Sequence, residues 1–333
     1  MAMKKILGDR NKLVEDTLKG FALAYSEKIS LVPNTHMVER KSPKSNGKVR
    51  FMIGNGSGHE PAVIGWVGAG MFDLNVPGEI YSAPTAHQIF EGIKRMSEGG
   101  PVLLAVQNHE GDVLNAGLAV QKAKNAGIDV ESVLFYDDVA SAPKGFEEER
   151  RGMAGMLFYA KIVGALAEQG ASIEACIKMF ERCRDATRTF SVAITNCTHP
   201  VTGISMFDDL PEDEISLGMG VHGESGGNTL KLPDAAGLAK YMSDILLEDM
   251  DILKKGDEIL VFVNGAGSTT MMEHFIFFKA LTAYLDNLGI KIIGSKLGNY
   301  LTTQELSGIS LSFMKCDNDM LSLWREPTDA TFF

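Results

Sequence analysis

Three segments of the sequence carry a residue that can do acid–base or nucleophilic chemistry. His59 ends a Gly-Asn-Gly-Ser-Gly-His stretch, Asp112 follows an apolar run, and His222 lies in a Leu-Gly-Met-Gly-Val-His-Gly-Glu stretch. Glycines at strand ends expose backbone N–H groups and let an oxygen-rich ligand approach closely. From spacing alone, tight turns that bind nothing explain the glycines equally well.

Several kinds of chemistry can be weighed against these residues. No His-x-His or His-x-x-x-His pair is present, so a metal site is not predicted. Gly56-Ser57-Gly58 lacks the G-x-S-x-G spacing of a hydrolase nucleophile. No Gly-Lys-Ser/Thr follows a glycine turn, and His59 occupies the last position of G-x-G-x-x-G, which argues against a nucleotide loop. Nucleophilic or acid–base histidines remain.

The elements that must position these residues alternate between apolar strands and helical patterns. Strands are predicted at 49–53, 101–107, 130–136, 189–194, 258–263, 290–293 and 309–315. Helices are predicted at 113–126, 233–247 and 270–288, and residues 152–186 are predicted to form two helices broken at Gly170-Ala-Ser. Near-continuous apolar strands linked by helices favour a parallel sheet covered on both faces, with ligands beyond the carboxyl ends of its strands. We predict two α/β domains. Residues 1–195 would form a domain with a mostly parallel sheet covered by helices on both faces, and residues 196–333 a smaller α/β domain with a mixed sheet.

Composition narrows the class of partner. The chain has 333 residues, with 45% hydrophobic and 23% charged residues, as in a soluble globular protein. Its net charge of −11 argues against nucleic acid or an anionic membrane as the main partner. The Met-Ala-Met-Lys-Lys-Ile start is not followed by an apolar segment, and no apolar run approaches the ~20 residues of a membrane span. We therefore expect a cytoplasmic protein.

The remaining candidates are predicted to be structural. Four cysteines without a Cys-x-x-Cys pair are expected to be free thiols rather than a disulfide or zinc site. Four scattered histidines, His36, His87, His199 and His274, are expected at the surface or satisfied in the structure. Phe275, Phe277 and Phe278 can pack either a core or a dimer interface.

The motifs taken together resemble a known family. Gly54-Asn-Gly-Ser-Gly-His-Glu-Pro61 and Leu217-Gly-Met-Gly-Val-His-Gly-Glu224 resemble segments of the substrate-binding K subunit of dihydroxyacetone kinases. The resemblance extends over nearly the whole chain and includes the segments Val67–Met71, Gly111–Gly117, Asp137-Asp138 and Arg151–Gly155.

The resemblance implies roles for individual residues. His222 matches the histidine whose ring nitrogen adds to the substrate ketone and gives a covalent hemiaminal, which a polyol such as glycerol cannot form. Asp112 matches the residue that binds a terminal hydroxyl and acts as its base. His59 matches a second polar group at the ligand. Three residues of the first loop match positions that contact or shape the site, namely Gly56, Ser57 and Gly58.

One departure affects the substrate. The family commonly has Val-Lys-Asn where this chain reads Val-Gln-Asn, so Gln107 replaces a cationic substrate contact with an amide. This change is compatible with a different ketose, such as one with four carbons.

The resemblance also implies a phosphotransferase, in which this chain carries no nucleotide or metal of its own. ADP or ATP and magnesium are expected on a separate L subunit, which a phosphotransferase-system protein recharges. A homodimer is expected. The alternative is a catalytically silent ketose sensor that acts as the coactivator of a transcription regulator; only the kinase needs Asp112.

Overall fold

The computed structural model describes residues 4–224 and 226–333 and divides the chain into two compact units. The parallel-sheet unit holds Ile6–Phe135, Leu157–Asp185 and Asp319–Phe333. The mixed-sheet unit holds Tyr136–Met156 and Ala186–Asn318, together with Lys4 and Lys5. Each unit contains a six-stranded sheet with helices, which confirms the prediction of two α/β units.

The units do not follow the predicted division at residue 195. β7 (Thr187–Ala193) belongs to the mixed sheet, where it pairs antiparallel with β12 (Gly308–Lys315). The chain from Asp319 onward belongs to the parallel-sheet unit. Both features depend on pairings between segments far apart in the sequence, which a local apolar pattern does not encode.

The sheet of the parallel-sheet unit has the order β1-β2-β4-β3-β5-β6. β4, β3, β5 and β6 run parallel to one another, whereas β1 and β2 form an antiparallel edge. The prediction of a mostly parallel sheet is therefore confirmed. The strands are β1 (Ile29–Leu31), β2 (Val38–Arg40), β3 (Arg50–Ser57), β4 (Leu74–Ile80), β5 (Val102–Gln107) and β6 (Val130–Phe135).

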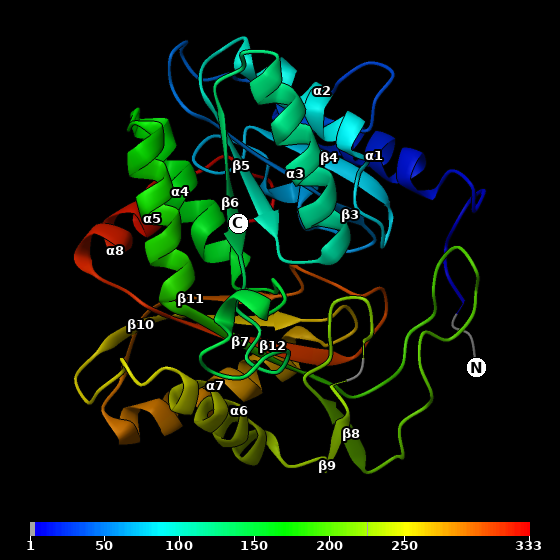
Figure 1. Cartoon of the computed structure of the whole chain (residues 1–333). Coiled ribbons are helices and arrows are strands. Elements are labelled where there is room, and N and C mark those ends of the chain that lie inside the picture. The colour runs from blue at the N-terminus through cyan, green and yellow to red at the C-terminus, as the bar shows by residue number, and fades with distance from the viewer. Residues whose placement is uncertain (1–3, 225) are drawn as a thin grey trace. The chain divides into compact units, whose positions relative to one another are not determined.

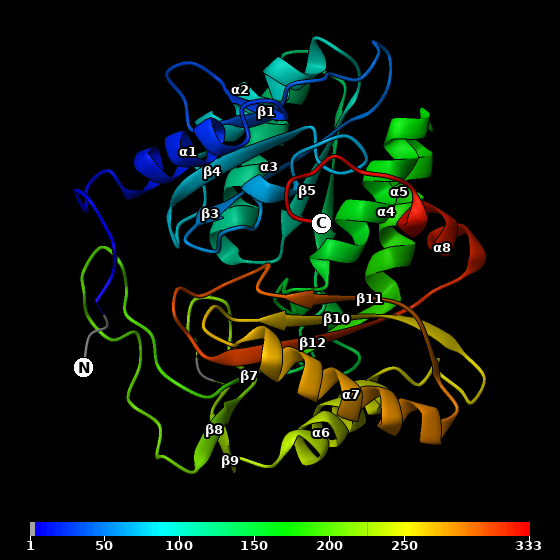
Figure 2. The ribbon, with the colours of Figure 1, turned by 180° about the vertical axis from the view of Figure 1, so that it is seen from behind.

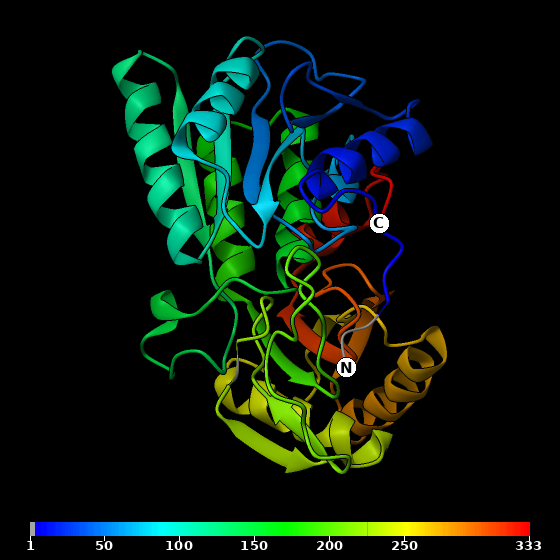
Figure 3. The ribbon, with the colours of Figure 1, turned by 90° about the vertical axis from the view of Figure 1, so that its right-hand side faces the viewer.

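Helices cover both faces of this sheet, as predicted. On one face, Ile89 and Ile93 of α2 pack with Leu74 and Leu104, and α3 lies beside α2 (Figure 3). On the other face, Phe135 contacts Tyr159 of α4, whose ring contacts Phe180 of α5. Because successive side chains point to opposite faces, a strand with a continuous apolar run, such as Val102–Val106 of β5, supplies both cores. The helices are α1 (Leu13–Ala24), α2 (Ala86–Ser97), α3 (Glu110–Asn125), α4 (Met156–Gln169), α5 (Ile173–Asp185) and α8 (Asn318–Arg325), with a 3-10 turn at Ile64–Trp66.

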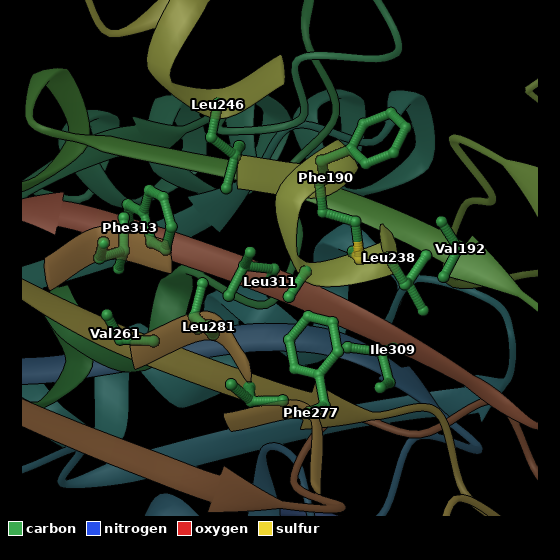
Figure 4. Packing of buried hydrophobic residues seen from close by; sticks show 14 of the residues in the cluster. Phe190, Val192, Leu238, Leu246, Val261, Phe277, Leu281, Ile309, Leu311 and Phe313 are labelled. Atoms are coloured by element: carbon green, nitrogen blue, oxygen red, sulfur yellow. The ribbon is translucent and has the colours of Figure 1, made fainter. Parts of the chain in front are cut away.

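The mixed sheet has the order β11-β10-β12-β7-β8-β9, and only β10 and β11 are parallel. Its helices α6 and α7 run beside each other below the sheet in Figures 1 and 2. Figure 4 shows Leu238 and Leu246 of α6 and Phe277 and Leu281 of α7 packed around Leu311. The remaining elements are β8 (Glu214–Leu217), β9 (Asn228–Lys231), α6 (Ala235–Asp249), β10 (Glu258–Gly265), α7 (Met271–Leu288), β11 (Lys291–Gly298) and a 3-10 turn at Glu147–Glu149.

Two element boundaries near the candidate site differ from the prediction. β3 continues through Ser57 instead of ending at Ile53, because Gly54 to Ser57 pair with β4. α3 begins at Glu110 rather than 113, with His109 as its N-cap, so Asp112 lies in its first turn and not in a loop.

Candidate functional site

The glycines after the apolar part of β3 are required by close packing. A Cβ on Gly56 would lie 3.0 Å from the backbone nitrogen of Ser82. Gly58 has φ +104°, and a Cβ there would lie 2.8 Å from Tyr81 Cε1. The Ser57 hydroxyl donates to the carbonyl oxygen of Gly78 at 2.7 Å. The segment is thus a fixed strand end pressed against the turn after β4.

His59 follows this strand end and is buried, with 5% of its surface exposed. Its ring lies against Tyr81, with centroids 5.1 Å apart and planes inclined by 43°. The next residue, Glu60, accepts a hydrogen bond from the backbone nitrogen of Gly58 at 3.0 Å. Burial nevertheless raises the pKa of Glu60 above its usual value, because desolvation outweighs the backbone hydrogen bonds.

Gln107 and Asp112 lie on either side of the junction between β5 and α3. Gln107 is the last residue of β5, and Asp112 is the third residue of α3; both are buried. The helix dipole favours negative charge at this end, so an ionised carboxylate is stabilised in the first turn.

The structure brings the two predicted loops of the parallel-sheet unit to one edge. β3 and β5 are parallel neighbours, so the strand ends at Ser57 and Gln107 point the same way. Gly56 packs on Ser82, and a Cβ on Gly111 would lie 3.4 Å from Ala83 Cβ. The two loops therefore meet the same short turn between β4 and α2.

His222 lies in the mixed-sheet unit, on the glycine-rich loop between β8 and β9. The loop is anchored at several backbone points. Gly218 donates its N–H to Ser191 O of β7 at 2.8 Å, and Thr303 Oγ1 donates to Val221 O at 2.7 Å. Gly220 donates its N–H to Glu224 O at 2.9 Å. The imidazole is thus carried on a constrained backbone and remains 27% exposed.

Glu224 holds both the ring and the backbone of His222. Its Oε1 lies 3.0 Å from His222 Nδ1, and its Oε2 accepts the His222 backbone N–H at 2.9 Å. Burial opposes ionisation of this carboxyl, but its hydrogen bonds and charge interaction with His222 are stronger in sum. They lower the pKa of Glu224 to about 2.

An ion pair between buried Asp138 and half-buried Arg151 contacts this loop. Arg151 Nη2 lies 2.7 Å from Asp138 Oδ2 and also donates to Gly218 O at 2.9 Å. A Cβ on Gly220 would lie 2.5 Å from Arg151 Nη1 and even closer to Glu224 Oε2. A larger residue at this position would have to displace the guanidinium and the carboxylate, because both crowd it.

Asp137 fixes the segment that carries Arg151. Its carboxyl accepts the backbone N–H groups of Met153 at 2.5 Å and Gly155 at 2.9 Å, and also the hydroxyl of Thr189. Desolvation by burial is the largest influence on this group, and it raises the pKa of Asp137 to about 7. The Asp137-Asp138 and Arg151–Gly155 motifs therefore form one support in the mixed-sheet unit.

The predicted site residues divide between the two units. The parallel-sheet unit carries Gly56, Ser57, Gly58, His59, Gln107 and Asp112, and the mixed-sheet unit carries His222. The roles of Glu224 and Arg151 beside His222, and of Tyr81 beside His59, were not predicted. For Glu224 the available signal was a carboxylate two residues after a histidine, with a glycine between them.

The other predictions concern thiols, aromatic residues and membrane spans. All four cysteines are free; three are buried and Cys316 is half-buried. Burial raises the pKa of Cys176 to about 11 and that of Cys197 to about 12, so neither is a ready thiolate. Phe277 is buried in the core and Phe275 is exposed. Among the described residues, which exclude the first three, no helix is long and apolar enough to cross a membrane.

Comparison with known proteins identifies the class. The Dak1 domain model matches residues 19–332, and the chain belongs to this family. The chain is 38% identical to the PTS-dependent dihydroxyacetone kinase 1, dihydroxyacetone-binding subunit DhaK, of Listeria innocua, over 96% of this chain and 98% of the relative. The resemblance to K subunits of dihydroxyacetone kinases is therefore confirmed.

Other relatives and solved structures extend the range of named functions. The D-erythrulose kinase of Mycolicibacterium smegmatis is 36% identical over 98% of this chain and 56% of that protein. The structure of the dihydroxyacetone kinase operon co-activator Dha-DhaQ has a TM-score of 0.89 at 31% identity, covering 95% of this chain and 97% of that chain. The C. freundii dihydroxyacetone kinase gives 0.89 at 26% identity, over 99% and 60% of the respective chains.

Proposed function

We propose that this chain is the substrate-binding subunit of a kinase for dihydroxyacetone or a similar short ketose. Full-length similarity to dihydroxyacetone-binding subunits supports this assignment. The structural observation that carries it is a half-exposed His222 on a hydrogen-bonded loop, in a chain whose other unit places His59 after β3 and Asp112 in the first turn of α3, after the neighbouring strand β5.

His222 captures the ketone. A ring nitrogen forms a bond to the keto carbon, and the π electrons of the carbonyl move to its oxygen. That oxygen takes up one proton and the other ring nitrogen gives one up, so the product is a neutral hemiaminal. A polyol has no electrophilic carbon, so the bond itself discriminates against glycerol.

Asp112 prepares the captured ketose for phosphorylation. Its carboxylate accepts the proton of a terminal hydroxyl as that hydroxyl attacks phosphorus. His59 orients the ligand and stabilises charge. Gly56, Ser57 and Gly58 shape the strand end, and Gln107 contributes an amide hydrogen bond.

The phosphoryl donor comes from a partner. A separate L subunit carries ADP or ATP with magnesium and delivers the phosphoryl group in trans, and a phosphotransferase-system protein recharges it. The relatives named PTS-dependent dihydroxyacetone kinase subunits support this arrangement. The chain acts as a homodimer in the cytoplasm and holds no nucleotide or metal of its own.

Gln107 makes a four-carbon ketose a second candidate substrate. An amide donates a hydrogen bond without positive charge, and relatives named D-erythrulose kinase and L-erythrulose kinase share 36% and 32% identity with this chain. Parallel assays of dihydroxyacetone and erythrulose, with and without Gln107→Lys, test this. Turnover of dihydroxyacetone alone by both proteins would count against the four-carbon substrate.

The test of the function measures capture and transfer separately. Intact mass spectrometry of the protein incubated with dihydroxyacetone should show an adduct that His222→Ala abolishes. His87→Ala, an exposed histidine on α2, serves as the matched control and should keep the adduct. With a candidate L subunit and a phosphoryl donor, the wild type should produce a phosphorylated ketose. An adduct that persists in His222→Ala excludes this residue from the mechanism.

A coactivator is the second candidate function. The similarity to the co-activator Dha-DhaQ covers nearly the whole of both chains, and Gln107 departs from the kinase pattern. A coactivator would form the same adduct but release no phosphorylated ketose with any L subunit. It would also bind a transcription regulator in a ketose-dependent way, which a pull-down with purified regulator measures.

A further inference from the structure

We propose that Glu224 is a positioning residue that determines which ring nitrogen of His222 reacts. Its carboxylate holds the proton on Nδ1 and thereby leaves the lone pair on Nε2 to add to the ketone. The inference deepens the proposed function and rests on it for its chemical consequence. The arrangement of the ring itself is a property of the ligand-free protein.

The geometry is a two-point clamp. Glu224 Oε1 meets His222 Nδ1 at 3.0 Å, while Oε2 meets the His222 backbone N–H at 2.9 Å. The left-handed conformation of Gly223, φ +79°, allows residue 224 to fold back onto residue 222. Both carboxylate oxygens are engaged, so the ring is fixed relative to its own backbone.

The charge of the clamp decides the tautomer. An ionised carboxylate only accepts hydrogen bonds, and the lowered pKa of Glu224 keeps it ionised at neutral pH. Nδ1 must therefore be the donor. In a neutral imidazole one nitrogen donates and the other carries the lone pair, so Nε2 is the nucleophile.

Two charged side chains crowd the glycine beneath the clamp. Glu224 Oε2 and Arg151 Nη1 both lie against the Cα of Gly220, within 2.5 Å of the position its Cβ would take. Arg151 also forms an ion pair with Asp138. Arg151 and Glu224 thus pack against the same glycine, and the Asp138–Arg151 ion pair lies next to the clamp.

This placement stabilises the captured state as it forms. When Nε2 bonds to the keto carbon, its lone pair is shared and the ring gains positive charge before Nδ1 loses its proton. A carboxylate 3.0 Å from Nδ1 offsets that charge. Glu224 thus acts on the addition through His222 and does not touch the substrate.

The test combines a spectroscopic and a kinetic measurement on the full chain. ¹⁵N NMR of histidine-labelled, ligand-free protein should show His222 with its proton on Nδ1 in the wild type, and a shift towards the Nε2-protonated tautomer in Glu224→Ala. Adduct formation with dihydroxyacetone, followed by intact mass, should slow by about 10- to 100-fold in Glu224→Ala, as for other partners that orient a histidine. Glu224→Gln, which keeps one carbonyl acceptor, should lie between the two.

The outcomes separate this inference from the proposed function. Half-buried Glu214, at the start of β8, supplies the control Glu214→Gln, which should change neither measurement. If Glu224→Ala keeps the wild-type tautomer and the wild-type rate, the inference is wrong. If the wild type forms no adduct, the proposed function and the kinetic half of the inference fail, and the tautomer measurement still decides the clamp. If circular dichroism shows that Glu224→Ala does not fold, Glu224→Gln is the deciding variant.

Discussion

Two histidine–glutamate pairs in this chain show opposite electrostatics. In the parallel-sheet unit, His59 lies against Tyr81, and the pKa of the neighbouring Glu60 is raised because the carboxyl is desolvated. In the mixed-sheet unit, His222 is half-exposed and Glu224 receives two hydrogen bonds from it, which bring the carboxyl's pKa to about 2. The same residue types thus yield one carboxyl that resists ionisation and one that is ionised at any physiological pH.

The difference between the two pKa values arises from the groups that surround each carboxyl. It does not arise from the number of residues between the glutamate and its histidine. Glu60 is half-buried and accepts a backbone hydrogen bond, but the loss of hydration has the larger effect on its pKa. Glu224 meets an imidazole and the backbone of the same residue, so the ionised form is favoured. The first carboxyl is therefore shifted towards its neutral form, and the second is an ionised group held against an imidazole.

The largest expected effect would separate proton transfer from capture. Asp112→Asn removes the proposed base of the parallel-sheet unit, so turnover with an L subunit should fall by roughly 10²- to 10⁴-fold. The adduct on His222 should form as before, because Asp112 takes no part in that bond. Glu110→Gln, in the same turn of α3 but exposed, is the matched control. Full turnover in Asp112→Asn would remove the base assignment.

The next largest effect is expected on stability, from loss of the Asp138–Arg151 ion pair that contacts the His222 loop. Arg151→Ala leaves the buried Asp138 carboxylate without its cation, and breaking such a pair costs about 3–5 kcal/mol. Urea unfolding measures the loss. Lys231→Ala, which removes the exposed pair with Asp213, should change stability by less than about 1 kcal/mol. If both variants lost the same free energy of unfolding, the Asp138–Arg151 pair would stabilise the fold no more than an exposed pair does.

Replacing two glycines by alanine should change stability by an intermediate amount and in opposite directions. Gly220→Ala places a methyl group against Glu224 and Arg151 and should destabilise the protein by about 1–3 kcal/mol while slowing adduct formation. Gly117→Ala in α3 meets nothing within 4 Å and should stabilise it by about 1 kcal/mol through helix propensity. Thermal denaturation of both variants checks the signs; a stabilised Gly220→Ala would contradict the crowding.

The smallest expected effect is on the pH dependence of stability, to which Glu224 and Glu60 contribute with opposite signs. The folded pKa of Glu224 is depressed, so its contribution to stability is present above pH 4.5 and is lost as the pH falls towards 2. The folded pKa of Glu60 is raised, so its contribution is present below pH 4.5 and is lost as the pH rises through the folded pKa.

Matched variants should reveal the two signs. Relative to wild type, Glu224→Gln should lose stability above pH 4.5 and match it near pH 2, while Glu60→Gln should gain relative stability as the pH rises above 4.5. Denaturation curves collected across this range give the comparison. Two variants with parallel pH profiles would show that the electrostatic contrast does not exist in solution.

Much of the architecture was predictable from local patterns. The apolar runs that became β5 and β6, and the helical spacing of α3 and α7, are local signals, and the two-unit α/β organisation followed from them. The division at residue 195 was not predictable, because β7 pairs with β12 across a long stretch of chain. The end of β3 was misplaced for the same reason: glycines read as loop, and pairing with β4 makes them strand.

The sequence by itself determined the reactive residue types and their family, because His222, Asp112, His59 and the glycines stand in motifs that can be read in order. Only the tertiary structure showed that Ser57 and Gln107 end on one sheet edge, and that Arg151 and Asp138 lie beneath the His222 loop. It alone showed that Glu224 folds back onto His222 through a left-handed glycine. The spacing of residues in the sequence identifies which chemical groups are present. The energies of their hydrogen bonds and of their burial depend on distances that are fixed only in the folded chain.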